Sequence, residues 1–308
     1  MSKEVHDAAD WKFRNMKGAD IEEVLVIIED HDEDDAEVAR QTYKTMGLRN
    51  KFILEVDGDI VGTTGFNEVE ASDRTYWLSW TYLDEDYRSR GWGRKMLDCL
   101  FERLQQRGAR KIFLTTSDYR DPEDGDVYAD ARRFYESLGF EPELTHRDFY
   151  RPGEAMLYYA RTLEPEQERP ACPEENRMEA ADHESADPEG LPPLPAEQDP
   201  SLEEVEETEY GVVPGARLTG ISEIPETLDA YGLDWQYTED GSMFTEKNLK
   251  KAINKAREWK ARVIFCSFPS DIPAVGPRLE AAGFEACGML MDFYEAGVHD
   301  CHWRLNLS

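Results

Sequence analysis

The chain has 308 residues, of which 40% are hydrophobic and 11% aromatic, and its formal net charge is −31 at pH 7. This length favours two domains, and this composition excludes wholesale disorder. Because binding to phosphate backbones needs a basic surface, the charge argues against nucleic acid and anionic membrane as partners. A basic or amine-bearing partner fits better.

No apolar run approaches the roughly 20 residues that a membrane-spanning helix needs. The first residues, Met1–Asp7, also lack the apolar core of a signal peptide. We therefore expect a cytoplasmic protein. The five cysteines are odd in number and form no Cys-x-x-Cys pair. We expect reduced thiols, with neither a disulfide framework nor a zinc ribbon.

The segment 164–209 is rich in Pro, Glu and Asp and shows no helical or strand-like apolar period. Such a composition is typical of an extended, disordered linker. The prediction is therefore two folded domains, 1–163 and 210–308, joined by this linker.

Hydrophobic periodicity places the elements of the first domain in chain order. Strands are predicted at 11–14, 51–56, 60–69, 76–83 and 111–115, and a final pair of strands lies within 142–163. Helices are predicted at 21–29, 36–46 and 129–138, and one more follows the glycine loop after residue 83. Antiparallel strands followed by strand–helix–strand–helix predict a mixed α/β sheet.

An internal repeat links the two domains. The run 108–115 resembles 260–267, Leu138–Glu141 resembles Ala282–Glu285, and Asp148–Gly153 resembles Asp292–Gly297. The last two matches share one offset, so the sequence predicts a duplication.

A short arginine- and glycine-rich loop carries the strongest chemical signal. It follows the strand 76–83, precedes an amphipathic helix, and reads Arg-Ser-Arg-Gly-Trp-Gly-Arg from Arg88 to Arg94. Glycines let backbone N–H groups approach a pyrophosphate, the helix N-terminus adds partial positive charge, and the arginines add ionic contacts. No Gly-x-Gly-x-x-Gly is present and no Gly-Lys-Ser/Thr follows the loop, so neither a Rossmann nor a Walker site is indicated.

The loop resembles the pyrophosphate signature Arg/Gln-x-x-Gly-x-Gly/Ala of the GNAT acetyltransferase superfamily. The run Ala131–Phe140 resembles the later helix of that family, which ends in Tyr-x-x-x-Gly-Phe. The resemblance covers residues 11–163 and implies a GNAT fold with a central, mixed, mostly antiparallel sheet. The region 210–308 would be a second, smaller and degenerate GNAT-like domain.

The resemblance implies an acetyl-coenzyme A dependent N-acetyltransferase that acts by direct transfer to a primary amine in a ternary complex. The cosubstrate would lie in a splay between strands 76–83 and 111–115, and its pantetheine would pair with the main chain near Tyr82 and Leu83. Its pyrophosphate would be bound by Arg88, Ser89, Arg90, Gly91, Trp92, Gly93 and Arg94. A non-catalytic acyl-coenzyme A sensor is the competing interpretation.

By match to the family motif, Tyr135 would donate a proton to the leaving thiolate. Glu68 is the candidate base, and Glu70 would face the acceptor from the same side of the strand end. A solvated strand edge explains both glutamates equally well, and a water-relayed base or the binding of a neutral amine remains open.

The acceptor side departs from the family pattern, because Tyr128 stands where an Asn is common. The acidic loop 117–126 would attract a cationic amine. Tyr150 lies in a hairpin that resembles the tyrosine-bearing hairpin of protein acetylating relatives, and it could line the acceptor site. The acceptor is either a small molecule or a peptide.

The C-terminal domain lacks these groups. Asp240–Thr245 holds no arginine at the place of the loop, and Leu279 stands at the place of Tyr135. We therefore expect one site per chain and a structural, acceptor-lining or dimerising role for this domain, which makes a homodimer possible. The cluster His299–His302 alternates on a strand, so we expect no metal site.

Overall fold

The computed structural model describes residues 9–123, 125–163, 215–238, 245–272 and 274–307. Backbone contacts divide these residues into two compact units. The first holds residues up to 114 together with 138–140 and 160–163, and the second holds 115–137, 141–159 and the residues from 215 onward. The chain therefore crosses between the units within single strands. The predicted linker 164–209 lies outside the described residues.

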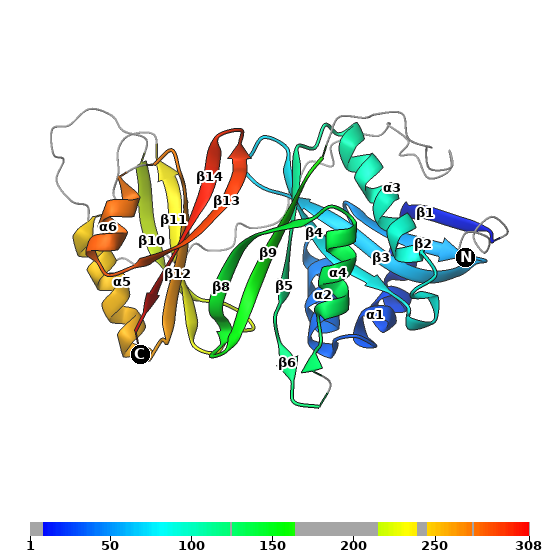
Figure 1. The fold of residues 1–308 in the computed structure, drawn as a ribbon, viewed down its shortest axis with the longest axis horizontal. Coiled ribbons are helices and arrows are strands. Elements are labelled where there is room, and N and C mark those ends of the chain that lie inside the picture. Colours follow the sequence, from blue (N-terminus) through cyan, green and yellow to red (C-terminus); the bar gives the residue numbers. More distant parts are fainter. Residues whose placement is uncertain (1–8, 124, 164–214, 239–244, 273, 308) are drawn as a thin grey trace. The chain divides into compact units, whose positions relative to one another are not determined.

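The N-terminal region carries a seven-stranded sheet in the order β1-β2-β3-β4-β5-β9-β8. Its strands are β1 (Trp11–Asn15), β2 (Lys51–Val56), β3 (Asp59–Glu68), β4 (Thr75–Leu83), β5 (Lys111–Ser117), β8 (Glu141–Arg151) and β9 (Glu154–Thr162). Strands β1 to β4 are antiparallel neighbours, and β4 pairs with β5 in parallel. The predicted mixed α/β architecture is confirmed (Figure 1).

Helices α1 (Ile21–Glu29) and α2 (Glu33–Thr45) cover one face of this sheet, and α3 (Trp92–Gln106) covers the other (Figure 1). Alternation along β2 explains the two faces, because successive side chains of a strand point to opposite sides. Ile53 joins the core of α1 and α2, whereas its neighbour Phe52 contacts Arg103 of α3, with the guanidinium 4.6 Å from the ring centre. The helix bounds predicted from periodicity are confirmed to within three residues.

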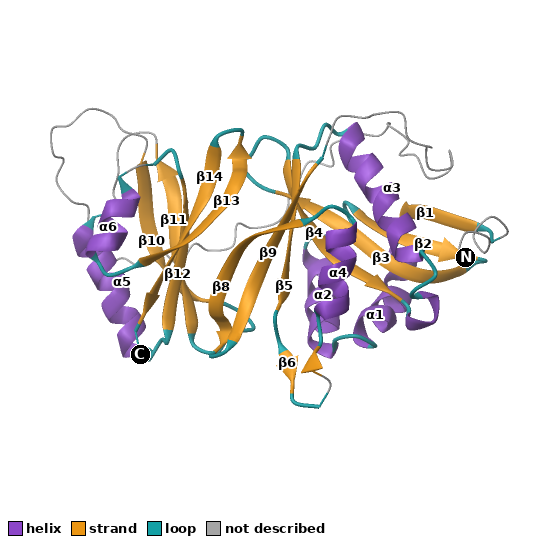
Figure 2. Ribbon diagram, viewed as in Figure 1, coloured by secondary structure: helices purple, strands orange, loops and turns teal. Residues whose placement is uncertain are grey.

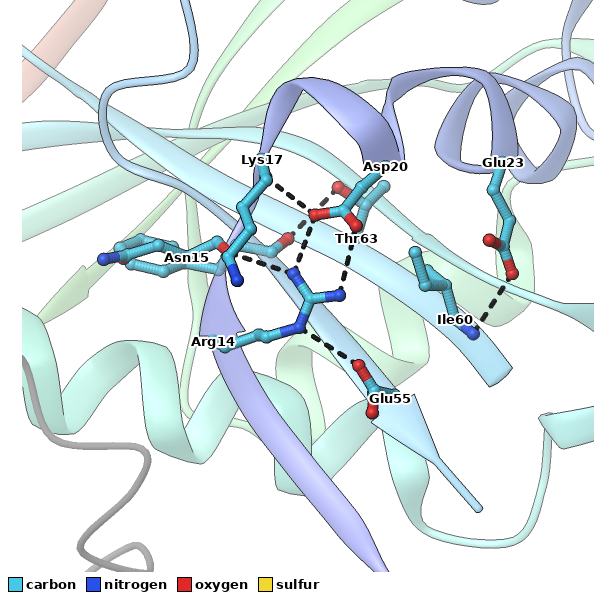
Figure 3. A network of polar contacts seen from close by, with 9 residues as sticks. Arg14, Asn15, Lys17, Asp20, Glu23, Glu55, Ile60 and Thr63 are labelled. Atoms are coloured by element: carbon cyan, nitrogen blue, oxygen red, sulfur yellow. Dashed lines mark hydrogen bonds and ion pairs between the residues drawn. The ribbon is translucent and has the colours of Figure 1, made fainter. Parts of the chain in front are cut away.

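A polar network fixes the start of the chain on this sheet (Figure 3). Arg14 of β1 donates to both carboxylate oxygens of Asp20, at 2.7 and 3.1 Å, and to Glu55 of β2 at 3.0 Å. Asp20 ends the short 3-10 helix η1 (Gly18–Asp20) and also accepts the backbone N–H of Lys17. The hydrogen bond from Arg14 lowers the pKa of Asp20. The turn into α1 is thereby held by a paired carboxylate.

The second unit contains α4 (Ala129–Ser137) and a small hairpin of β6 (Arg120–Asp121) and β7 (Gly125–Asp126). The sequence did not predict this hairpin. Arg132 of α4 donates to the carbonyl of Ser117 at 2.8 Å and to Asp126 at 2.6 Å. The acidic loop 117–126 is therefore held against α4 by Arg132.

The C-terminal region forms a five-stranded sheet in the order β10-β11-β12-β14-β13. Its strands are β10 (Gly215–Glu223), β11 (Ala230–Thr238), β12 (Val263–Pro269), β13 (Glu285–Glu295) and β14 (Val298–Asn306). Helices α5 (Glu246–Glu258) and α6 (Val275–Ala281) pack on one face of this sheet through a shared apolar core (Figure 2). A second sheet-rich region is thus present, as predicted.

The cysteines differ from the prediction at Cys99. Cys99 of α3 is disulfide-bonded, whereas Cys266, Cys287 and Cys301 are free thiols. The expectation of reduced thiols throughout is therefore wrong, because an odd number of cysteines does not prevent a pair. No helix among the described residues is long and apolar enough to cross a membrane.

Candidate active site

The loop that joins β4 to α3 has the backbone that an anion requires. Strand β4 ends at Leu83, and a short 3-10 helix, η2 (Glu85–Tyr87), follows it. Gly91 is the N-cap of α3, and its φ of 89° lies in the left-handed region that favours glycine. Gly91 brings no side chain to cap the helix, so the N–H groups of the first turn face the loop. A pyrophosphate fits this arrangement.

The arginines of the loop are exposed, and Arg88 and Arg90 make contacts within the loop and its surroundings. Arg88 contacts the ring of His31, forms an ion pair with Glu85 at 3.4 Å, and donates to the carbonyl of Leu83. Arg90 lies over the ring of Tyr87 at 5.9 Å. Exposed ion pairs contribute little stability, so a phosphate could replace these contacts at low cost.

Of the other predicted loop residues, Trp92 is placed differently from its neighbours. Its side chain is only 3% exposed, and its ring centre lies 6.5 Å from that of Trp11. Only the backbone of Trp92 can therefore face a ligand. Ser89 and Gly93 belong to the loop and the first turn of α3, and Ser89 has a positive φ of 57°. Arg94 is exposed on the first turn of α3.

Strands β4 and β5 part soon after they meet. Their parallel pairing covers only Thr75–Trp77 against Lys111–Phe113, so the rest of β4 has left β5 by residue 78. The predicted splay between these strands is confirmed as a feature of the fold.

A β-bulge lies in β4 where the two strands part. Thr63 of β3 is opposite Tyr82 and Gly65 is opposite Ser79, so three residues of β3 face four of β4. Trp80 within the bulge has a φ of 36°, which is rare for a bulky residue. Sequence reasoning missed this bulge, because no glycine or proline near Trp80 signals it.

A cluster of titratable residues from the turn between α1 and α2 lies against the end of β4. The hydroxyl of Tyr82 donates to Asp35 of α2, and His31 contacts the carbonyl of Leu83 at 3.0 Å. Burial raises the pKa of Asp35, whereas burial and the nearby charge of Arg88 lower the pKa of His31. Sequence reasoning missed both residues, although the acid-rich run 29–35 was a signal.

The predicted base Glu68 lies away from the loop. It is exposed at the end of β3, opposite Tyr76 near the start of β4. At about 3.3 Å per residue, Tyr76 is roughly 23 Å along the strand from Leu83. Its role as base stays a prediction.

Glu70 lies just past the strand. Strand β3 ends at Glu68, and Glu70 lies in the turn that follows. The backbone N–H of Val69 bonds to the carbonyl of Thr75 at 2.9 Å, so β3 and β4 stay in contact one residue beyond Glu68. The predicted alignment of Glu70 with Glu68 on one side stays a prediction.

Tyr135 lies on α4, where its partly buried ring is 5.6 Å from that of Phe134. Tyr128, at the departure from the family pattern, accepts the backbone N–H of Arg132 just before this helix. Tyr135 belongs to the second unit, and its role as acid stays a prediction.

Tyr150 packs beside residues of the C-terminal region within the second unit. Its carbonyl accepts the N–H of Leu228 at 2.7 Å, and its side chain joins an apolar cluster that includes Phe149 and Phe265. Its predicted role at the acceptor site is untested.

The C-terminal counterparts of the site residues have structural surroundings. Leu279 is fully buried in the core, and Thr245 caps α5 by accepting the N–H of Asn248 at 3.2 Å. Asp240–Phe244 lie outside the described residues. On β14, Asp300 and His302 are buried while His299 is more exposed, which confirms that His299 and His302 face opposite sides.

Comparison with protein-family models finds one match. Residues 19–140 match the model of the Acetyltransferase (GNAT) family. Comparison with curated proteins finds no match.

Solved structures with similar folds include three acetyltransferases. One is a putative GNAT acetyltransferase from Desulfovibrio desulfuricans, with 25% identity, a TM-score of 0.44, and coverage of 51% of this chain and 100% of that one. Another is the ribosomal-protein-S18-alanine N-acetyltransferase from Escherichia coli, with 20% identity, a TM-score of 0.39, and coverage of 53% and 100%. A ribosomal-protein-alanine N-acetyltransferase from Brucella melitensis has 21% identity, a TM-score of 0.40, and coverage of 49% and 99%.

The family model spans β3, β4, the Arg88–Arg94 loop, α3, β5 and α4. This match supports acetyl transfer from acetyl-coenzyme A as the general chemistry. Within this chain, the similarity to the acetyltransferase (GNAT) family covers residues 19–140.

Proposed function

We propose that the protein is an N-acetyltransferase that transfers the acetyl group of acetyl-coenzyme A directly to a primary amine. The observation that carries this proposal is the left-handed, uncapped N-terminus of α3 at Gly91, placed directly after a strand that has separated from its parallel neighbour. The thioester supplies an activated acetyl group. The protein has to bind and orient the two substrates and to deprotonate the acceptor amine.

The residues that would hold the cosubstrate lie along one path. The backbone N–H groups from Gly91 to Arg94 would bind the pyrophosphate, and Arg88 and Arg90 would add charge. The pantetheine would pair with the main chain of β4 near Tyr82 and Leu83. The bulge at Trp80 supports this assignment, because a bulge redirects backbone groups that a regular ladder would use. A redirected N–H could polarise a carbonyl as an oxyanion stabiliser.

The acceptor would be a cationic amine, either a small molecule or a peptide. The acidic run from the end of α1 to the first turn of α2, where Asp35 bonds to Tyr82, supports a positively charged acceptor. Tyr135 would protonate the leaving thiolate. We also propose that the protein acts in the cytoplasm with one cosubstrate site per chain, and that the C-terminal region derives from a duplication.

The test is release of coenzyme A thiol from acetyl-coenzyme A against a panel of amines and peptides, with binding measured by calorimetry. Turnover on at least one amine is expected. Tight binding without turnover on any acceptor would instead favour the non-catalytic sensor. Absence of binding would contradict both functions.

A further inference from the structure

A buried lysine crosses the sheet beside the bulge. Lys51 of β2, Gly65 of β3 and Ser79 of β4 are directly opposite one another in the strand register. The Lys51 Nζ donates to the Ser79 Oγ at 2.7 Å and to the Asn67 Oδ1 at 3.0 Å. A Cβ on Gly65 would lie 2.9 Å from the Lys51 Cδ, so the glycine leaves room for the lysine stem.

The charge of this lysine has no carboxylate partner in the described parts of the chain. Lys51 is 4% exposed, and its hydrogen bonds go to a hydroxyl and an amide. Buried lysines are normally paired with an acid, and this chain has 66 acidic residues to draw on. Burial lowers the pKa of Lys51 to about 8. The amine can therefore exist in its neutral form near physiological pH.

The position of Ser79 connects this lysine to the proposed site. Ser79 lies two residues after Trp77, the last residue of β4 that pairs with β5, and directly before the bulge residue Trp80. Along the strand it is roughly 13 Å from Leu83, at about 3.3 Å per residue. Ser79 lies where β4 and β5 part. The pantetheine of acetyl-coenzyme A, which carries the acetyl group, would extend toward this point from the Arg88–Arg94 loop.

We propose that Ser79 takes the proton of the acceptor amine, and that Lys51 is the positioning residue that receives the hydroxyl proton of Ser79. The proposal rests on the function proposed above. The cationic acceptor first releases one proton to solvent and reacts as the neutral amine; its nitrogen then forms a bond to the acetyl carbon, and the carbon–sulfur bond breaks. The nitrogen loses one proton to the Ser79 Oγ, the former Ser79 proton moves to the Lys51 Nζ, and the thiolate takes a proton from the proposed acid. After the product leaves, Lys51 returns its proton to solvent and the proposed acid, Tyr135, takes one back from solvent.

Other titratable groups near Lys51, Gly65 and Ser79 point away from the Lys51 amine or stay neutral. Glu68 is the neighbour of Asn67 on β3, so it points to the opposite face, where its charge affects Tyr76. Tyr43 of α2 is on the face of Lys51, and burial raises its pKa to about 12. Asp35 and His31 lie beyond the bulge, at Tyr82 and Leu83. On β1, the backbone N–H of Met16 bonds to the carbonyl of Lys51.

The first test is Lys51→Met in the full chain, with the matched variant Lys111→Met, which replaces a second buried lysine. Turnover of the wild type should rise with pH through about 8, because neutral Lys51 is needed. Lys51→Met should lower kcat about 100-fold, remove this rise, and leave coenzyme A affinity and thermal stability unchanged. Lys111→Met should keep the wild-type pH profile. The same acceptor is used with every variant, so titration of the acceptor amine contributes equally to each pH profile and cancels when the profiles are compared.

A double-mutant cycle with Ser79→Ala separates a shared role from two independent ones. If the two residues act as a unit, the double variant should be no slower than Lys51→Met alone. A wild-type pH profile in Lys51→Met, or a rise that disappears in Asp35→Asn instead, would overturn the inference. Either result leaves the proposed function intact as long as the wild type turns over. A wild type without turnover on any amine would overturn the proposed function itself.

Discussion

The N-terminal and C-terminal regions share a strand order and differ at the residues that chemistry would need. The order β3-β4-β5-β9-β8 corresponds to β10-β11-β12-β14-β13. In each region one pair of neighbouring strands is parallel, β4 with β5 and β11 with β12, and each of these pairings covers three residue pairs. The hairpins also match. The N–H of Gly153 bonds to Asp148 and that of Gly297 to Asp292, both at 2.8 Å. The two regions therefore have the same strand scaffold.

Two local features separate the regions. The N-cap residue of the helix after the second strand of each series is Gly91 in the N-terminal region, where no side chain caps the helix, and Thr245 in the C-terminal one, where the side chain does. The bulge lies in β4 in the first case, whereas in the second the extra residue is on β10, between Leu218 and Gly220. The comparison teaches that a small number of backbone irregularities, and not the sheet itself, distinguish a candidate site from a structural element.

The largest effect is expected from Gly91→Glu. A side chain at a φ of 89° costs about 1–2 kcal/mol, and a carboxylate there would repel a phosphate. Coenzyme A affinity should fall at least about 100-fold, which is about 2.7 kcal/mol. Gly297→Glu is the matched control, because Gly297 has a φ of 85° in the C-terminal region. Calorimetry measures both, and unchanged affinity in Gly91→Glu would refute the loop assignment.

A smaller loss is expected from Tyr135→Phe. Removal of a proton donor should lower kcat about 10- to 100-fold while coenzyme A affinity stays the same. The control is Tyr231→Phe, which removes a hydroxyl in the C-terminal region. Steady-state kinetics with the acceptor found by the panel measures this, and equal kcat in the two variants would remove Tyr135 from the mechanism.

The polar network of β1 and α1 has no counterpart among the described C-terminal residues, which start at β10. Asp20→Asn should therefore destabilise the N-terminal region alone, by about 2 kcal/mol. Because Arg14 lowers the pKa of Asp20, its contribution is present above the ordinary value of 3.8 and is lost as the pH falls through the lower folded value. Amide exchange in β1 and β2 should show wild type and variant converging toward about pH 2.

The smallest effect is expected from Thr245→Ala. Loss of the cap of α5 should destabilise the C-terminal region by about 1 kcal/mol, without any change in coenzyme A affinity. Thermal unfolding and calorimetry measure the two quantities. A fall in affinity would show that the C-terminal helix takes part in binding and would weaken the contrast with Gly91.

The sequence predicted most elements, because periodicity and turn residues are local signals. It predicted the loop at Arg88 from a motif, and it predicted the separation of β4 from β5 through a family resemblance. It did not predict the contacts of Lys51 with Ser79 or of Asp35 with Tyr82, which join residues 28 and 47 positions apart. The alternation of side chains between the two faces of the sheet, on which the sequence reasoning relied, also fails at the bulge in β4. Ile53 aligns with Thr63 and Tyr82, and Lys51 with Gly65 and Ser79, so Ser79 and Tyr82 share a face although they are three residues apart.

The hairpin of β8 and β9 shows that continuity of the chain and continuity of packing are different properties. Arg262 of the C-terminal region donates to the carbonyls of Asp148 and Phe149, at 2.6 and 3.1 Å, and Phe149 packs against Phe265. A single peptide-bond cut between residues 164 and 214 would separate the chain into two pieces but would leave these contacts in place. Such a nick divides the polypeptide without dividing the second unit, so a cleaved sample could still migrate as one particle.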